Sequence, residues 1–123
     1  MRLTQRKGDL ATVQAIATFT KMGFDVSIPI TESASYDIVV DTLEVLKRVQ
    51  VKYSSDKKVD LRNIHSNSNG YVVKKAKDNS YDWLYVLYVK GDVVEEHLFK
   101  ECFVNRRSVS LTESSQIIYG EVA

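Results

Sequence analysis

The chain has 123 residues, 44% of them hydrophobic, which is the usual size and composition of one compact domain with its own core. No apolar run approaches the roughly 20 residues of a membrane helix, and the segment MRLTQRKGD has no signal-peptide core, so we expect a soluble, cytoplasmic (intracellular) protein. The single cysteine, Cys102, has no internal disulfide partner and is interpreted as an ordinary part-buried thiol in a reducing compartment.

The net charge of +1 does not by itself indicate nucleic-acid binding, but the charges are unevenly distributed. Residues 47–77 contain nine Lys or Arg and two acids, whereas residues 78–101 contain two Lys or Arg and six acids. The middle of the chain can therefore present a basic surface to phosphates.

The first predicted element is an amphipathic helix from Thr4 to about Met22. Thr4 is a candidate N-cap, and Gly23 is a candidate helix stop. Apolar residues recur at helical spacing along it, namely Leu10, Val13, Ile16, Ala17 and Phe19.

Two strands in a hairpin are predicted after a short strand at residues 24–30 and a polar loop at residues 31–35. The runs YDIVVD and VLKRVQVKYS are rich in β-branched residues and are separated by a few polar residues, which favours antiparallel pairing. Alternation in the second run places Val49, Val51 and Tyr53 on one face, with Gln50 and Lys52 on the other.

The remainder is predicted as a flexible Asn-rich loop at residues 63–70, a short ordered segment from Tyr71, and a pair of strands joined by a Lys-Gly-Asp turn in YDWLYVLYVKGDVVEEHLF. The segment RRSVSLT can supply one more strand. This order of elements predicts an α/β domain built on a mixed sheet.

Asp37 opens the first strand of the hairpin, and Gln50 and Lys52 share a face of the second, so a carboxylate, an amide and an ammonium can converge at one sheet edge. Phosphodiester hydrolysis uses a hard cation with oxygen ligands and positive charge near the developing oxyanion. An Asp at a strand start and an exposed Lys are also common solvent-facing choices, so these residues alone do not establish a nuclease.

The segments KGDLATVQAI, GFDVSIPI, YDIVVD and RVQVKYSS, in this order and spacing, resemble the group I intron-associated homing endonucleases of the PD-(D/E)XK superfamily. The resemblance extends from about Thr4 to Leu111 and treats residues 1–123 as a single nuclease domain. It implies an α/β fold with a restriction-endonuclease-like core, in which helices flank a mixed β-sheet. It also implies a Mg²⁺-dependent, site-specific double-strand DNA endonuclease.

The resemblance also implies roles for individual residues. Asp37 matches the motif carboxylate that binds the metal, and Lys52 matches the motif lysine that orients the attacking water. Gln50 stands where most of the superfamily has Asp or Glu, and glutamine there is similar to the intron-associated branch. The main-chain carbonyl of Val51 is a further candidate metal ligand.

One residue departs from the family pattern. Relatives with a KGD opening place a Glu where this chain has Thr12, on the helix face that meets the sheet. Asp37 is then the only formal anion among the expected metal ligands, so weakened metal binding and impaired activity are expected. Asp9, three residues earlier on the same helix face, is an alternative ligand or simply a favourable charge near the helix start.

DNA contacts are expected from the basic middle segment, with cations for phosphates and polar side chains for base edges. The candidates are Lys57, Lys58, Arg62, His65, Asn67, Asn69, Tyr71, Lys74, Lys75 and Lys77. Cutting both strands of a duplex calls for two symmetry-related sites, which implies a homodimer or homotetramer. The aromatic run YDWLYVLYV is interpreted as core, with a role in assembly as the alternative.

Two other functions remain open. Loss of the acidic residue at Thr12 is compatible with a non-catalytic DNA-binding homologue that kept the fold. A Holliday-junction resolvase has the same order of core motifs, and fold-level analogy does not decide between the substrates.

Overall fold

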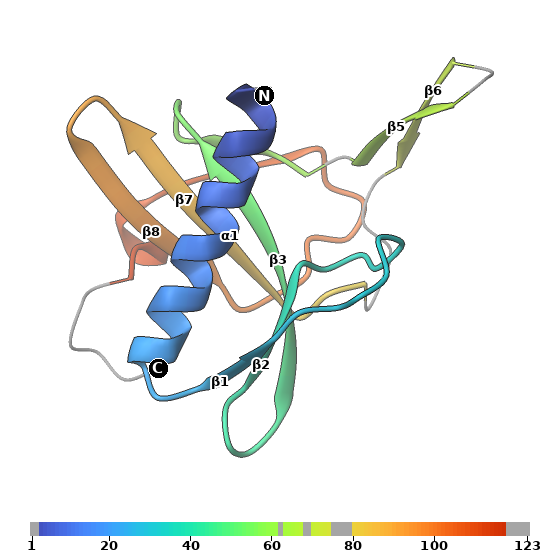
Figure 1. The fold of residues 1–123 in the computed structure, drawn as a ribbon. Coiled ribbons are helices and arrows are strands. Elements are labelled where there is room, and N and C mark those ends of the chain that lie inside the picture. Colours follow the sequence, from blue (N-terminus) through green and yellow to red (C-terminus); the bar gives the residue numbers. More distant parts are fainter. Residues whose placement is uncertain (1–2, 62, 68–69, 75–79, 118–123) are drawn as a thin grey trace.

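A five-stranded mixed sheet forms the centre of the computed structural model, which describes residues 3–61, 63–67, 70–74 and 80–117 (Figure 1). The strand order is β1 (Asp25–Ser27), β2 (Ile38–Asp41), β3 (Leu46–Ser54), β7 (Trp83–Lys90) and β8 (Val93–Phe99). Only β3 and β7 are parallel; the other neighbours are antiparallel. The predicted mixed sheet, the hairpin of β2 and β3, and the hairpin of β7 and β8 are confirmed.

One long helix, α1 (Leu3–Lys21), crosses one face of this sheet (Figure 1). Its end at Gly23 is confirmed: this glycine has a φ of +91°, and Phe24 N–H donates to the Phe19 carbonyl at 3.1 Å. This is the hydrogen-bond pattern of a Schellman motif. The helix begins at Leu3, so the predicted N-cap, Thr4, lies inside its first turn, a boundary difference of the usual size.

The buried face of α1 differs from the predicted one. Ala11, Ala15 and Phe19 are fully buried, whereas Leu10 and Val13 are 51% and 63% exposed. Small alanines let the helix backbone approach the sheet closely, and Phe19 then packs against the rings of Trp83 and Tyr85. Steric fit to the sheet therefore outweighed side-chain hydrophobicity in choosing the helix face.

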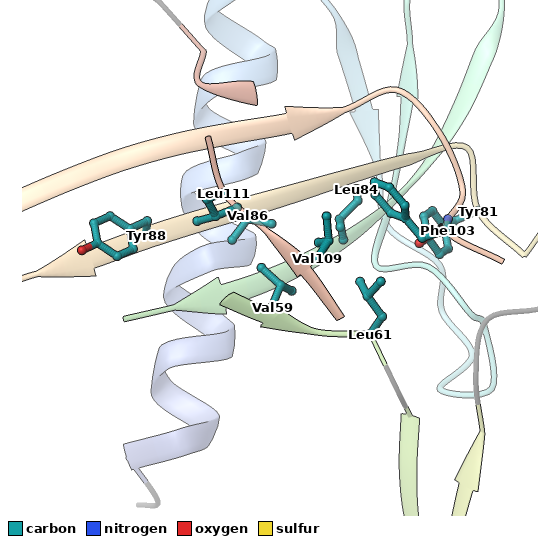
Figure 2. Packing of buried hydrophobic residues seen from close by; sticks show 9 residues of the cluster. All are labelled: Val59, Leu61, Tyr81, Leu84, Val86, Tyr88, Phe103, Val109 and Leu111. Carbon is teal, nitrogen blue, oxygen red and sulfur yellow. Dashed lines mark hydrogen bonds between the residues drawn. The ribbon is translucent and has the colours of Figure 1, made fainter. Parts of the chain in front are cut away.

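The second face of the sheet is covered by a ribbon of two short antiparallel strands, β4 (Lys58–Asp60) and β9 (Ser108–Ser110). Val59 and Val109 of this ribbon pack with Leu84, Val86 and Tyr88 of β7, as Figure 2 shows. The predicted mixed α/β core is confirmed, but within the described ranges this face carries a β-ribbon where helices were expected. The predicted late strand in RRSVSLT is confirmed as β9.

An arm made of β5 (Asn63–Asn67) and β6 (Gly70–Lys74) extends away from the main sheet (Figure 1). The prediction of a flexible loop at residues 63–70 is therefore wrong for residues 63–67, which pair antiparallel with residues 70–74. Backbone pairing satisfies the main chain of both strands, and this outweighs the poor strand propensity of the asparagines. Tyr71 lies in β6, which confirms the ordered segment predicted to begin there.

The chain returns to the edge strand β8 through the short 3-10 helix η1 (Glu113–Ser115). The Ser115 hydroxyl lies 2.7 Å from Nδ1 of the fully buried His97, and a backbone bridge joins His97 to Gln116.

Among the described helices, none is long and apolar enough to cross a membrane.

Candidate active site

Asp37 lies immediately before β2 and is held against β3 through its main chain and its side chain. Its N–H donates to the Val49 carbonyl at 2.9 Å, and its Oδ2 accepts the N–H of Val51 at 2.7 Å. The carboxylate therefore occupies the edge of β3 just beyond the last residue pair of β2, which is Ile38 with Val49.

The Val51 carbonyl is directed to the same edge. In a β-strand the N–H and C=O groups of one residue point to the same side, and the Val51 N–H points at Asp37. The Asp37 carboxylate and the Val51 carbonyl, two oxygen groups of the kind that Mg²⁺ prefers, are thus directed to one short stretch of open strand edge.

Gln50 and Lys52 lie on the face of β3 that is turned away from α1. They pair in register with Leu84 and Val86, whose side chains belong to the cluster beneath the ribbon. Val49, Val51 and Tyr53 pack instead in the cluster beneath α1. The predicted alternation of β3 is confirmed, and it separates the polar candidates from the helix.

The charges of Asp37 and Lys52 influence each other. Although Asp37 is an exposed residue, desolvation of its carboxylate against the protein raises its pKa, and the Val51 N–H and the Lys52 charge oppose this shift. Desolvation lowers the pKa of Lys52, with the charges of Asp37 and Asp60 opposing it. A carboxyl and an ammonium with pKa values shifted toward each other are typical of functional sites, although structural ion pairs show the same behaviour.

Asp60 was not a candidate in the sequence, and it enters the electrostatic surroundings of Lys52 only through the fold. The chain reverses tightly after β3, where Lys57 has a φ of +69° and the Ser54 hydroxyl donates to the Lys58 carbonyl at 2.8 Å. This turn brings β4, and Asp60 at its end, back over the face that carries Lys52. The run Ser-Ser-Asp-Lys after β3 was the available signal for such a turn.

Thr12 lies on α1 between two residues that meet the sheet. The ammonium of Lys7 is 5.5 Å from the ring centre of Tyr53, and the Phe19 ring meets Trp83 and Tyr85, the register partners of Val49 and Val51. The helical segment that carries Thr12 therefore lies over the part of the sheet that includes residues 49–53 of β3. The Thr12 hydroxyl donates to the Gly8 carbonyl at 3.1 Å, so it is bonded within its own helix, and Asp9 nearby is exposed.

The oxygen donors of this edge suit a hard cation in chemical type, since they comprise a carboxylate and a main-chain carbonyl, and Gln50 is the neighbouring residue on β3. They contain one formal anion, Asp37. Within the residues that the structure describes, no three His, Cys, Asp or Glu side chains gather into a metal-binding group.

The candidate DNA-contacting residues fall into three groups. Lys57 donates to Glu95 Oε1 at 2.7 Å and lies 4.4 Å from the ring centre of Tyr88, whereas Lys58 is exposed on β4. The arm includes the main chain of His65, Asn67, Tyr71 and Lys74. Four others, Arg62, Asn69, Lys75 and Lys77, lie outside the described residues.

Comparison with known proteins identifies the family. A family profile described as PD-(D/E)XK endonuclease matches residues 2–111. The solved structure of a bacterial homing endonuclease, I-Ssp6803I, superposes with a TM-score of 0.72 at 29% sequence identity, covering 91% of this chain and 80% of that one. Comparison with curated proteins finds no significant match. The chain belongs to the PD-(D/E)XK endonuclease family, and its fold is similar to that of this homing endonuclease.

Proposed function

We propose that the protein is a Mg²⁺-dependent, site-specific double-strand DNA endonuclease of homing type, with activity weakened by Thr12. The observation that carries this proposal is the convergence of the Asp37 carboxylate, the Val51 carbonyl and the Lys52 ammonium around one strand edge of a nuclease fold. A hard cation there would polarise the phosphoryl group and activate a water molecule.

The residues of this chain divide the remaining work. Asp37, the Val51 carbonyl and the Gln50 amide would hold the cation. Lys52, on the same face as Gln50, orients the attacking water and places a positive charge where the phosphate oxygens gain negative charge. Partial desolvation of both Asp37 and Lys52 strengthens their electrostatic action on a bound phosphate.

The neutral residue Thr12 supports the proposal of a weak site. A longer acidic side chain at this position, on the helical segment that lies over β3, would add a second anion near the strand edge beyond the end of β2. A neutral hydroxyl bonded to Gly8 provides no such charge. The same observation favours the alternative function, a non-catalytic DNA-binding homologue, if Asp37 alone cannot retain a cation.

The deciding experiment is cleavage of a randomised duplex library in Mg²⁺ by the native chain and by the Thr12→Glu variant. Val13→Glu is the matched control, because it adds the same charge at the next helical position, whose side chain is 63% exposed. Cleavage by Thr12→Glu but not by Val13→Glu supports a nuclease site disabled at Thr12. Duplex binding without cleavage by any of the three proteins, in Mg²⁺ or Mn²⁺, would refute the endonuclease and favour the binding homologue.

A four-way-junction substrate is tested in the same assay. A Holliday-junction resolvase binds and cuts a junction in preference to linear duplex, so competition between the two DNAs separates it from a homing-type enzyme. We expect linear duplex to compete at least as well as the junction.

Cutting both strands also requires a second copy, and we propose that it packs against the tip of the β2–β3 hairpin. Leu43, Val45 and Leu46 are 76%, 50% and 66% exposed there. Leu43 has a φ of +76°, a conformation that disfavours leucine. An exposed leucine in a strained turn does not serve the core, which supports a role in association.

The surface beside this tip suits a self-complementary contact. An open groove of about 420 Å³ there is lined by apolar side chains, among them Met22, Phe24 and Trp83, and by both charge signs, with Glu44 facing the same groove as Lys47 and Lys100. Across a two-fold axis the acid of one copy can meet the cations of the other. Beyond Trp83, the aromatic residues of β7 are not available for this purpose, because the strand is central and they are buried.

A further inference from the structure

Two arginines that are distant in sequence from the basic middle segment lie at the base of the β5–β6 arm. Arg107 precedes β9, and its carbonyl accepts the N–H of Leu61 at 3.0 Å. Leu61 follows β4 directly, and the arm begins two residues later at Asn63. Pairing of Asp60 with Ser108 extends this contact into the ribbon. The loop that carries Arg106 and Arg107 is therefore bonded to the segment from which the arm departs.

The loop is held in place by buried groups. The guanidinium carbon of Arg106 lies 5.1 Å from the ring centre of Phe103, which is 5% exposed. The Phe103 N–H donates to the Tyr81 hydroxyl at 3.1 Å, and Asn105 turns the chain with a φ of +57°. Arg106 and Arg107 are themselves exposed. The contacts of this loop with buried groups restrict its main chain, which reduces the entropy cost of binding a ligand.

The charges of these two arginines are also uncommitted within the described part of the chain. Arg48 is paired with Asp82, and Lys57 is paired with Glu95. Among the residues that the structure describes, no carboxylate lies within ion-pair distance of Arg106 or Arg107. Exposed arginines without an acidic partner are suited to bind phosphate, which accepts two parallel hydrogen bonds from a guanidinium group.

The position of the loop relates it to the candidate active site. Val59 of the ribbon packs in one cluster with Val86, and Val86 is the register partner of Lys52. The ribbon, the arm base and Lys52 thus belong to the same side of the sheet. A duplex that contacted both Lys52 and the arm would therefore also pass the Arg106–Arg107 loop, which lies at the base of the arm.

We propose that Arg106 and Arg107 bind backbone phosphates of the DNA duplex between the candidate active site and the arm. This inference rests on the DNA-binding function proposed above. The two arginines position the duplex and do not read its sequence, because phosphate contacts are independent of base identity.

The test is fluorescence-anisotropy titration of a labelled random-sequence duplex with the full chain at several salt concentrations without Mg²⁺. We expect Arg106→Ala/Arg107→Ala to bind on the order of 10- to 100-fold more weakly near 0.1 M salt, with the slope of log K against log salt reduced by about two. The control Lys21→Ala/Lys90→Ala removes the same charge from exposed positions on α1 and at the end of β7. Arg106→Lys/Arg107→Lys retains the charge and is expected to retain the slope.

The outcomes separate the two proposals. If the native chain binds no duplex, the proposed function fails, and this inference fails with it. If the native chain binds and the two alanine double variants have equal affinity and equal salt slopes, the arginine site is overturned while the DNA-binding function stands. Matching thermal unfolding midpoints of all four proteins exclude a folding defect.

Discussion

The Oδ2 atom of Asp37 accepts the main-chain N–H of Val51 at 2.7 Å, across the end of β2. This bond fixes the orientation of the carboxylate relative to the strand that carries Gln50 and Lys52. It also gives Asp37 a structural role, since the Val51 N–H would lose its partner without it. The proposed metal ligand and a main-chain anchor are therefore the same side chain, and substitutions can separate the two roles.

Asp37→Asn is expected to retain the anchor and lose the anion. An amide oxygen still accepts the Val51 N–H, so the free energy of unfolding should change by no more than about 1 kcal/mol, whereas Asp37→Ala should cost about 1 kcal/mol more. Both variants should lose binding of Mg²⁺ or Mn²⁺ in calorimetric titrations. Unchanged metal binding by Asp37→Asn would remove this residue from the proposed ligand set.

Lys52→Met is expected to lower cleavage by about 10²- to 10³-fold while leaving duplex affinity nearly unchanged, because the ammonium acts on charge that develops during the reaction. The measurement is single-turnover cleavage in whichever of the native and Thr12→Glu backgrounds cuts. Lys58→Met is the matched control, since Lys58 is exposed on β4 and should affect binding alone. A Lys52→Met protein that cuts at the parent rate contradicts the assigned role.

Asp82→Asn is expected to destabilise the fold at neutral pH by about 1 kcal/mol or less. Asp82 accepts the Arg48 N–H at 2.8 Å and Arg48 Nε at 3.2 Å, joining β3 to the start of β7. Both side chains are about one third exposed, so solvent screens the pair. Urea denaturation measures this loss in the free energy of unfolding. Asp92→Asn in the β7–β8 turn is the control for removing one carboxylate charge.

The contribution of Asp82 should depend on pH. The Arg48 guanidinium lowers the pKa of the Asp82 carboxyl below its ordinary value of 3.8. A folded-state pKa below the unfolded one means that the stabilisation is fully present above about pH 4 and is lost as pH falls through the folded-state value. The difference in the free energy of unfolding between the native chain and Asp82→Asn should therefore become smaller at about pH 3. A difference that becomes larger there would contradict the ion pair.

Leu43→Glu/Leu46→Glu is expected to shift the protein to a smaller assembly, because it introduces like charges where two apolar hairpin tips would meet. Sedimentation velocity across a range of concentrations measures this change. Val94→Glu is the control, since Val94 on β8 is 62% exposed and distant from the tip in sequence. A native chain that is monomeric at all concentrations would refute the hairpin-tip contact. A double variant that forms the same assembly as the native chain would refute it as well.

Much of the local structure was predictable from the sequence. The helix end at Gly23, the β2–β3 and β7–β8 hairpins and the alternating faces of β3 follow from glycine chemistry and from period-two patterns. The errors lie where two local signals competed. Asparagines suggested a loop where β5 and β6 pair, and large apolar residues suggested a helix face where Ala11 and Ala15 are buried.

The candidate site was predictable only in part. Asp37 and Lys52 were identified through their spacing and their resemblance to a family motif, and they lie on adjacent strands of one hairpin. Asp60 and the Arg106–Arg107 loop were not identified, because β4 returns over β3 by a tight turn and β9 joins β4 from a distant part of the chain. No short sequence pattern encodes such a pairing.

The sequence by itself determined the helix and the hairpins, because each depends on neighbours within a few positions. The order and spacing of its motifs also indicated the nuclease family and the residues proposed for chemistry. Only the tertiary structure decided that β3 pairs in parallel with β7, that the Asp37 carboxylate bonds to Val51, and that Arg107 meets Leu61. These relationships bring distant segments together, and their stability comes from hydrogen bonds and burial that exist only once the whole sheet has formed.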